Sequence, residues 1–236
     1  MGLDASHFIR RRTNKSAVTE KRIINILNAV INSYHRIKQD KIVFDYSTRG
    51  KIKQEDFLRN RFVDDFLQEQ LNEIAEGTYK YIANKDAEEE YRTIIDNVLH
   101  NDPIDIHITI IDLTNFNNAQ KKPYFAIECK RFTSGAVSEY LGEIKKFTER
   151  SYTLTRLPFE GQIGFIEKTH LNASLLVKTI NGRLEAEDCP IHTLEELNPY
   201  LIQGKFPNSY KSKHRKLNQI DFEIFHLFLD YSKLVN

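Results

Sequence analysis

Three residues in the middle of the chain have the types and the spacing that metal-dependent phosphodiester chemistry needs. Asp105 lies in the apolar run PIDIHITIIDL, and Glu128 and Lys130 lie two apart in a second run, KKPYFAIECKRF. Two carboxylates can hold a divalent cation, and an ammonium can act on the attacking water or on the developing charge. Residues two apart on a strand share a face, so Glu128 and Lys130 project together while Cys129 points the other way.

Each of these residues also has an ordinary structural interpretation. A Glu-x-Lys triplet on a strand is often an exposed ion pair, and an Asp at the start of a strand is often a cap or turn residue. His107 shares a face with Asp105, and a lone strand histidine is usually a structural hydrogen-bonding group. The functional interpretation therefore depends on the elements that bring Asp105, Glu128 and Lys130 together.

Before Asp105, the pattern predicts helices at residues 16–36 and 53–76, a short extended piece at KIVFDYS, and a helix from about residue 83 to Leu99. From Ile104 to Ile110 apolar residues alternate strictly, which predicts a strand. A polar turn, TNFNNAQKKP, separates it from a strand at 124–132, and the two strands are expected to form a hairpin. A helix at 134–150, a strand at GQIGFIEK, a helix at NASLLVKTINGRL and a strand at IDFEIFHLFLDYS complete the pattern. The expected fold class is α/β, with a mixed central sheet flanked by helices.

This arrangement resembles the PD-(D/E)XK phosphodiesterase superfamily, the fold of many restriction endonucleases. The resemblance rests on Pro-Ile-Asp at Asp105, with one residue more than the simplest motif between proline and acid, and on Glu128-Cys129-Lys130. It implies an αβββαβ core over about residues 54–170. Residues 1–53 would then be a basic helical extension and 171–236 a C-terminal elaboration of a nuclease-like domain, 54–236, in one compact unit.

The resemblance also implies a third acid from the helix before the strands, and Glu55 is the best match. Asp56, Asp64 and Asp65 compete with it. In some branches of the superfamily, a residue just after the motif also contributes to the active site. The comparable positions here are Gln162, Glu139, Tyr140 and Glu143.

The expected cofactor is Mg²⁺, with Mn²⁺ able to substitute, because both prefer oxygen ligands. The expected ligands are Asp105, Glu128, Glu55 and the backbone carbonyl of Cys129, whose side chain turns away. Lys130 is expected to orient or deprotonate the attacking water, or to offset charge in the transition state.

Charge is unevenly distributed although the net charge is only +1. Residues 1–60 hold 13 Lys and Arg against 6 Asp and Glu, and the segment KFPNSYKSKHRK, expected to be a loop, carries five positive charges. Such blocks suit phosphate contacts, although solvated surface is the ordinary alternative. The candidate nucleic-acid contacts are Arg131, Lys211, Lys213 and Arg215, with Arg10–Arg12 as a basic arm.

Other features indicate a cytoplasmic protein. No apolar run approaches the roughly 20 residues of a membrane span, and the first residues lack the apolar centre of a signal peptide. Only two cysteines, Cys129 and Cys189, are present, without the spacing of a zinc site, which is typical of a reducing compartment.

The sequence therefore favours a metal-dependent endonuclease acting on DNA rather than RNA, in the manner of a restriction or antiphage effector. A regulatory protein partner and a homodimer are expected. A homodimer is expected because cleavage of both strands of a duplex needs either two active sites or one active site that cuts twice. The alternative is a catalytically inactive nuclease-like module that binds nucleic acid or a partner protein. A remoter alternative is a surface salt bridge on an unrelated α/β scaffold.

Overall fold

The computed structural model describes residues 5–75, 77, 79–113 and 122–236, and for residues 5–18 it describes the backbone alone. The described residues form one eight-stranded sheet with the order β4-β1-β2-β3-β5-β8-β7-β6. β3, β5 and β8 run parallel to one another, and the other neighbours are antiparallel. The strands are β1 Tyr79–Thr93, β2 Leu99–Asp112, β3 Tyr124–Phe132, β4 Arg150–Tyr152, β5 Phe159–Ile166, β6 His192–Pro199, β7 Ser209–Arg215 and β8 Asp221–Asp230.

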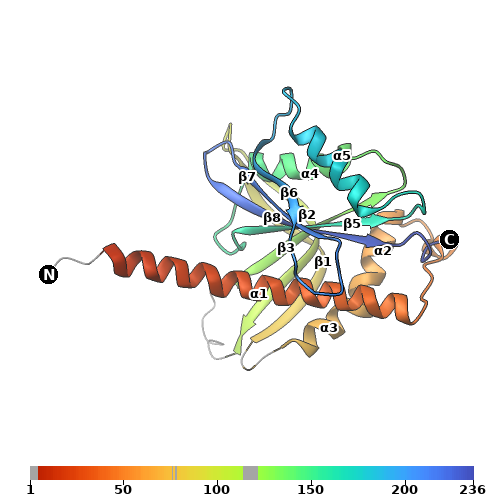
Figure 1. Ribbon diagram of the computed structural model, residues 1–236. Coiled ribbons are helices and arrows are strands. Elements are labelled where there is room, and N and C mark those ends of the chain that lie inside the picture. Colours follow the sequence, from red (N-terminus) through yellow and green to blue (C-terminus); the bar gives the residue numbers. More distant parts are fainter. Residues whose placement is uncertain (1–4, 76, 78, 114–121) are drawn as a thin grey trace.

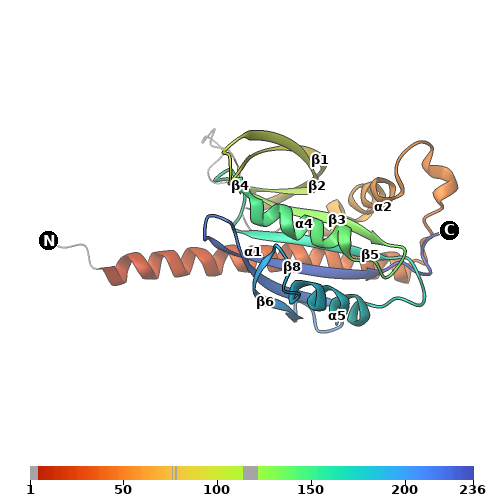
Figure 2. The ribbon, with the colours of Figure 1, turned by 90° about the horizontal axis from the view of Figure 1, so that it is seen from above.

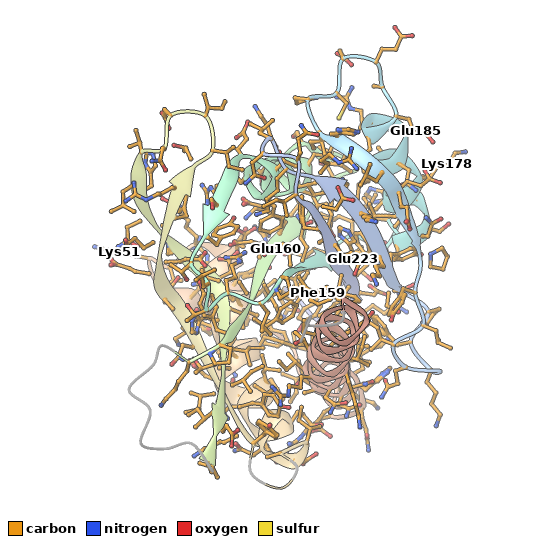
Figure 3. All side chains as sticks on the ribbon, turned by 90° about the vertical axis from the view of Figure 1, so that its left-hand side faces the viewer. Lys51, Phe159, Glu160, Lys178, Glu185 and Glu223 are labelled. Atoms are coloured by element: carbon orange, nitrogen blue, oxygen red, sulfur yellow. The ribbon has the colours of Figure 1, made fainter. Side chains whose placement is uncertain are left out.

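Helices cover both faces of the sheet (Figures 1 and 2). One face carries α1 (Ala5–Gln39), α2 (Gln54–Phe62) and α3 (Gln68–Glu73), and a π-helical turn, Val63–Leu67, joins the last two. The other face carries α4 (Ser138–Glu149) and α5 (Ala173–Leu184). Figure 3 looks along α1 and shows it on one side of the sheet, with α5, marked by Lys178 and Glu185, on the other.

Apolar side chains at helical spacing attach the helices to the sheet. On α4, Tyr140, Ile144 and Phe147 recur every three or four residues and pack in one cluster with residues of α5 and β8. β5 is buried along its whole length. It approaches its neighbours so closely that a Cβ added at Gly164 would lie 2.6 Å from the Phe132 ring. The centre of the sheet is therefore rigidly packed on both faces.

The mixed α/β class expected from the sequence is confirmed, as are helical segments within residues 16–36 and 53–76. The helix expected from about residue 83 to Leu99 is wrong, because β1 continues to Thr93 and pairs with β2 along its length. Alanine and glutamate favour a helix in isolation, but strand pairing and burial override this preference. Tyr81, Glu89 and Tyr91 are all buried in β1.

The loop expected between Lys205 and Lys216 is also wrong, since Ser209–Arg215 form β7 between β6 and β8. The extended piece expected at KIVFDYS is reduced to a single bridge from Phe44 to Val235, followed by a 3-10 turn, Tyr46–Arg49. Residues 114–121 of the expected polar turn lie outside the described residues.

Along the chain, α2 and α3 are followed by β1, β2, β3, α4 and then β5. The short strand β4 follows α4 directly and pairs with β1 at the sheet edge. No helix in the described part of the chain is long and apolar enough to cross a membrane.

Candidate active site

Asp105 and Glu128 meet where the β2–β3 ladder ends. The ladder's final pair joins Ile106 to Ile127, and one more step in the same register places Asp105 opposite Glu128. Beyond this pair the backbone N–H of Cys129 donates to Oδ2 of Asp105 at 2.7 Å. The Cys129 side chain is buried in the core that contains α1, so only its backbone contributes to the site.

Arg59 of α2 holds Asp105 in this position. Its Nη1 lies 2.7 Å from Oδ1 of Asp105, and its Nη2 lies 2.8 Å from Oδ1 of Asp86. Asp86 is directly across from Asp105 in the β1–β2 register and has a φ of 52°, a left-handed conformation that Asp tolerates better than most residues. Because the Arg59 side chain is only 3% exposed, a buried guanidinium fixes both carboxylates.

The carboxyl group of Glu128 lies in an excess of negative charge. The carboxylates of Asp105 and of Glu143 on α4 act on it, and the charge of Arg156 opposes them. Burial, followed by the charges of Asp105 and Glu143, raises the pKa of Glu128 well above its ordinary value. Carboxyl groups in contact are stabilised by a shared proton or by a cation. The surroundings of Glu128 are therefore suited to binding a cation.

Oxygen atoms surround the ammonium of Lys130. Nζ lies 3.3 Å from Oε1 of Glu55, 3.3 Å from Oε1 of Glu143 and 2.9 Å from the carbonyl oxygen of Cys129. Burial lowers the pKa of Lys130, but the charges of Glu143 and Glu55 outweigh burial, and the net pKa is above the ordinary value. This arrangement favours a charge-stabilising role for Lys130 over that of a general base, which requires a lowered pKa.

Glu55 is the acid of α2 that the structure brings into contact with Lys130. Its Oε2 also accepts a hydrogen bond from the backbone N–H of Arg131 at 3.2 Å. Burial is the main cause that raises the pKa of Glu55, against the opposing charge of Lys130. The competing acids pair elsewhere: Asp56 with Arg59, Asp64 with Lys85, and Asp65 with Arg61.

Two further residues border the site. The Glu143 side chain is 9% exposed and contacts both Lys130 and Lys146. Gln162 of β5 lies opposite Glu128 in the β3–β5 register, and its Nε2 donates to the carbonyl oxygen of Tyr140 at 2.8 Å. Its buried Oε1 has no hydrogen-bond partner in the described part of the chain. A buried acceptor without a donor, on the residue paired with Glu128, is costly and favours a proton or cation nearby.

Other residues considered from the sequence have structural partners. Glu139 is exposed on the first turn of α4, whereas the Tyr140 hydroxyl is buried 2.9 Å from Nδ1 of His226. His107 stacks on Tyr124 with ring centroids 4.3 Å apart. The side chains of Arg10–Arg12 lie outside the described residues.

The candidate nucleic-acid contacts are not gathered around the triad of Asp105, Glu128 and Lys130. Arg131 follows Lys130 on β3, but its guanidinium makes a two-pronged ion pair with Glu167. The remaining three lie on β7, the third strand from β3 in the sheet order. Lys211 pairs with Glu20 and Glu223, while Lys213 and Arg215 pair with Asp221.

Two open cavities flank the triad along β3. One, of about 640 Å³, is lined by residues that include His107 and Tyr124, near the start of β3. The other, of about 580 Å³, is lined by residues that include Gln54, Arg131 and Thr133, near its end. Asp105 and Glu128 line neither of these two cavities, and Lys130 lines a third, smaller one.

The donor set fits magnesium although it is not a ready-made cage. In the described part of the chain, no three His, Cys, Asp or Glu side chains form a group that could hold a metal ion. Mg²⁺ does not require one, because it keeps several waters and usually binds through one or two carboxylates. Asp105 and Glu128 in contact, the Cys129 carbonyl, and an ammonium already bound among carboxylates together fit such an ion.

Comparison with known proteins identified no relative. No family model, no curated protein and no solved structure matches this chain. The functional argument therefore depends on the chemistry of the residues themselves.

Proposed function

We propose that this protein is a metal-dependent nuclease that hydrolyses phosphodiester bonds, with DNA as the favoured substrate. The observation that carries the proposal is that Asp105 and Glu128 lie beside each other on two neighbouring strands, while Lys130, two residues further on, contacts Glu55 and Glu143 from helices on opposite faces. Apart from the short edge strand β4 between α4 and β5, the chain order α2/α3, β1, β2, β3, α4, β5 supports it, because the PD-(D/E)XK core has the order αβββαβ.

Each residue has a distinct role in this proposal. Asp105, held by Arg59, and Glu128 bind Mg²⁺ or Mn²⁺. The bound ion supplies Lewis acidity toward the phosphate and a lowered pKa for a coordinated water. Lys130 offsets the negative charge that develops on the phosphate. Glu55 holds the Lys130 ammonium at 3.3 Å in the metal-free site. Because carboxylates outnumber cations here, phosphate binding is itself expected to require the metal.

One observation favours a second candidate, an inactive nuclease-like module that binds nucleic acid or a partner protein. Both oxygens of Asp105 already accept protein donors, one from Arg59 and one from the Cys129 N–H. A carboxylate oxygen has more than one lone pair, so these bonds leave room for a metal. They also suit a purely structural Asp105, and an experiment must separate the two functions.

The test is a cleavage assay with supercoiled plasmid, linear duplex, single-stranded DNA and RNA, each in Mg²⁺, Mn²⁺ or EDTA. We expect the wild type to cut DNA in Mg²⁺ or Mn²⁺ and to be inactive in EDTA. Asp105→Asn is expected to be inactive, while Asp64→Asn, which makes the same chemical change at an exposed acid of the π-helical turn that pairs with Lys85, is expected to be active. Cleavage that persists in EDTA or in Asp105→Asn would exclude the metal mechanism. Salt-sensitive binding without cleavage of any substrate would favour the inactive module.

A further inference from the structure

We propose that Lys130 and the divalent cation compete for the same oxygen atoms, so that cation binding displaces the Lys130 ammonium from Glu55, Glu143 and the Cys129 carbonyl. This inference rests on the proposed function and describes how its site is loaded. Displacement releases the ammonium to face the phosphate. The site then presents its cationic side chain to substrate only after the metal has bound.

The competition follows from the chemistry of the atoms around Lys130. Its three neighbours are two carboxylate oxygens at 3.3 Å and a carbonyl oxygen at 2.9 Å. Carboxylate and carbonyl oxygens are also the protein ligands that Mg²⁺ and Mn²⁺ select. The Cys129 carbonyl is the clearest case, because it is the backbone ligand expected for the metal and already accepts the hydrogen bond of the ammonium.

Charge explains why the cation would replace the ammonium. We define the site cluster as five carboxylates and two cations: Glu55, Asp86, Asp105, Glu128 and Glu143 with Arg59 and Lys130. Asp56 and Lys146, which pair with Arg59 and Glu143 at its border, add one charge of each sign. A single ammonium leaves this cluster negative, and a divalent ion neutralises it more completely. Both cations bound to the same oxygens would repel each other strongly at such short separations.

The Lys130 side chain has both the freedom and the space to leave. Lysine has a flexible four-carbon stem, and this one is 15% exposed. A cavity of about 100 Å³ adjoins it, lined by residues that include Arg131, Thr133 and Ser134. One water occupies about 30 Å³ of liquid, so the cavity can accept an ammonium with its hydration. Arg59 has no such freedom, because its side chain is 3% exposed and is held by several carboxylates.

Lys146 provides a matched control. Its Nζ lies 2.9 Å from Oε1 of Glu143, the same oxygen that Lys130 contacts, but its side chain is 46% exposed on the outer side of α4. Removal of Lys146 deletes the same charge close to the same carboxylate. It leaves the ammonium among Glu55, Glu143 and the Cys129 carbonyl. Comparison of the two variants therefore separates a specific exchange at Lys130 from a general effect of removing one positive charge near Glu143.

The experiment measures binding of Mn²⁺ alone by electron paramagnetic resonance of the free ion, at one pH, with no nucleic acid present. We expect Lys130→Met to bind Mn²⁺ about tenfold more tightly than the wild type, because the internal competitor is gone. Lys146→Met is expected to change the affinity by less than about threefold, as for an exposed pair. Glu128→Gln is expected to bind Mn²⁺ at least about tenfold more weakly, since a ligand is lost.

A readout on the wild type makes the test independent of any variant's folding. Amine-selective labelling followed by mass spectrometry should modify Lys130 faster in Mg²⁺ than in EDTA, with Lys146 labelled equally in both. Unchanged or weaker Mn²⁺ binding by Lys130→Met, an equal gain in Lys146→Met, or Lys130 labelling that ignores Mg²⁺ would each overturn the exchange.

These results also separate this inference from the proposed function. If the exchange is observed but the wild type cuts no substrate, the nuclease proposal fails while the exchange stands. If Mn²⁺ binds equally to wild type and Lys130→Met while DNA is cleaved, the exchange fails and the nuclease stands. If no Mn²⁺ binding depends on Glu128, both fail.

Discussion

Two ionic clusters lie on the same sheet, and they differ in charge balance. The closed cluster, defined here as Arg156, Glu89, Glu160 and Lys216, pairs two glutamates with two cations. Arg156 forms ion pairs with both glutamates, its side chain is 3% exposed, and the Tyr124 hydroxyl donates to Glu89. Lys216 lies close enough for Glu160 and Glu89 to oppose the lowering of its pKa by burial. The site cluster, by contrast, sets five carboxylates against two cations.

This difference in charge balance indicates which cluster is structural and which is expected to bind a ligand. A balanced and fully hydrogen-bonded cluster can remain buried without help from solvent or ligand, although it adds little stability of its own. An unbalanced cluster is stable only if some carboxyl groups take up protons or if a cation binds. Burial raises the pKa of a glutamate in both clusters, Glu128 in one and Glu89 in the other, whereas the unpartnered Oε1 of Gln162 lies on the residue paired with Glu128, in the unbalanced region. Charge imbalance, rather than burial of charge as such, therefore indicates where a ligand is expected.

The largest expected effect is on catalysis. Glu128→Gln should lower the rate of Mg²⁺-dependent DNA cleavage by on the order of a thousandfold, because the variant loses a metal ligand. Glu160→Gln makes the same chemical change in the closed cluster and should leave the rate per folded molecule unaltered. The measurement is single-turnover cleavage of one duplex with both variants at saturating Mg²⁺. Equal losses in the two variants would contradict the assignment of catalysis to the unbalanced cluster alone.

A smaller effect, on stability, should appear in the opposite cluster. Arg156→Met should lower the free energy of unfolding by about 3–5 kcal/mol, because Glu89 and Glu160 would be left buried without their partner. The measurement is urea unfolding followed by circular dichroism. Arg215→Met, which removes an exposed arginine paired with Asp221, is the control and should leave the unfolding midpoint almost unchanged. A small effect at Arg156 would show that the closed cluster is more hydrated than its burial indicates.

The sequence predicts the triad because its signal is local. Strict alternation from Ile104 to Ile110 identifies a strand, and a two-residue spacing places Glu128 and Lys130 on one face of the next. Neither inference needs knowledge of distant contacts. Glu55 entered as a metal ligand through the family resemblance rather than through any periodicity, and its contact with Lys130, 75 residues away, was not expected from the sequence.

The residues that sequence reasoning missed depend on tertiary contacts. Glu89 is buried because it meets Arg156, which is 67 residues away, so the helix expected around residue 83 could not be excluded locally. The contact between Arg59 and Asp105 likewise joins α2 to β2. Glu143 was not missed: it was already a candidate from its place after the motif, and it also falls within the apolar stripe of α4 formed by Tyr140, Ile144 and Phe147. A charged residue at a buried helical position is more informative than one on an exposed face.

The smallest expected effect is the pH dependence of stability without metal. The folded pKa of Glu128 is raised, so the folded state binds its proton more tightly than the unfolded state. Its stabilising contribution is present below the unfolded pKa and is lost as pH rises through the folded pKa. Glu128→Gln carries no charge at any pH. In EDTA its free energy of unfolding should therefore match that of the wild type near pH 4 and exceed it at pH 8.

The two clusters are distinguished by the sign of the stability difference between each Glu→Gln variant and the wild type at pH 8. Glu160→Gln should be less stable than the wild type at pH 8, because it removes a carboxylate partner from buried Arg156. Subtracting the wild-type curve removes the contribution of buried His214 and His226, which all three proteins share. The measurement is urea unfolding at half-unit pH intervals in EDTA. A stability difference for Glu128→Gln that stays flat with pH would mean that the charge of Glu128 is already compensated by the protein, and a metal would then not be needed to stabilise this carboxylate.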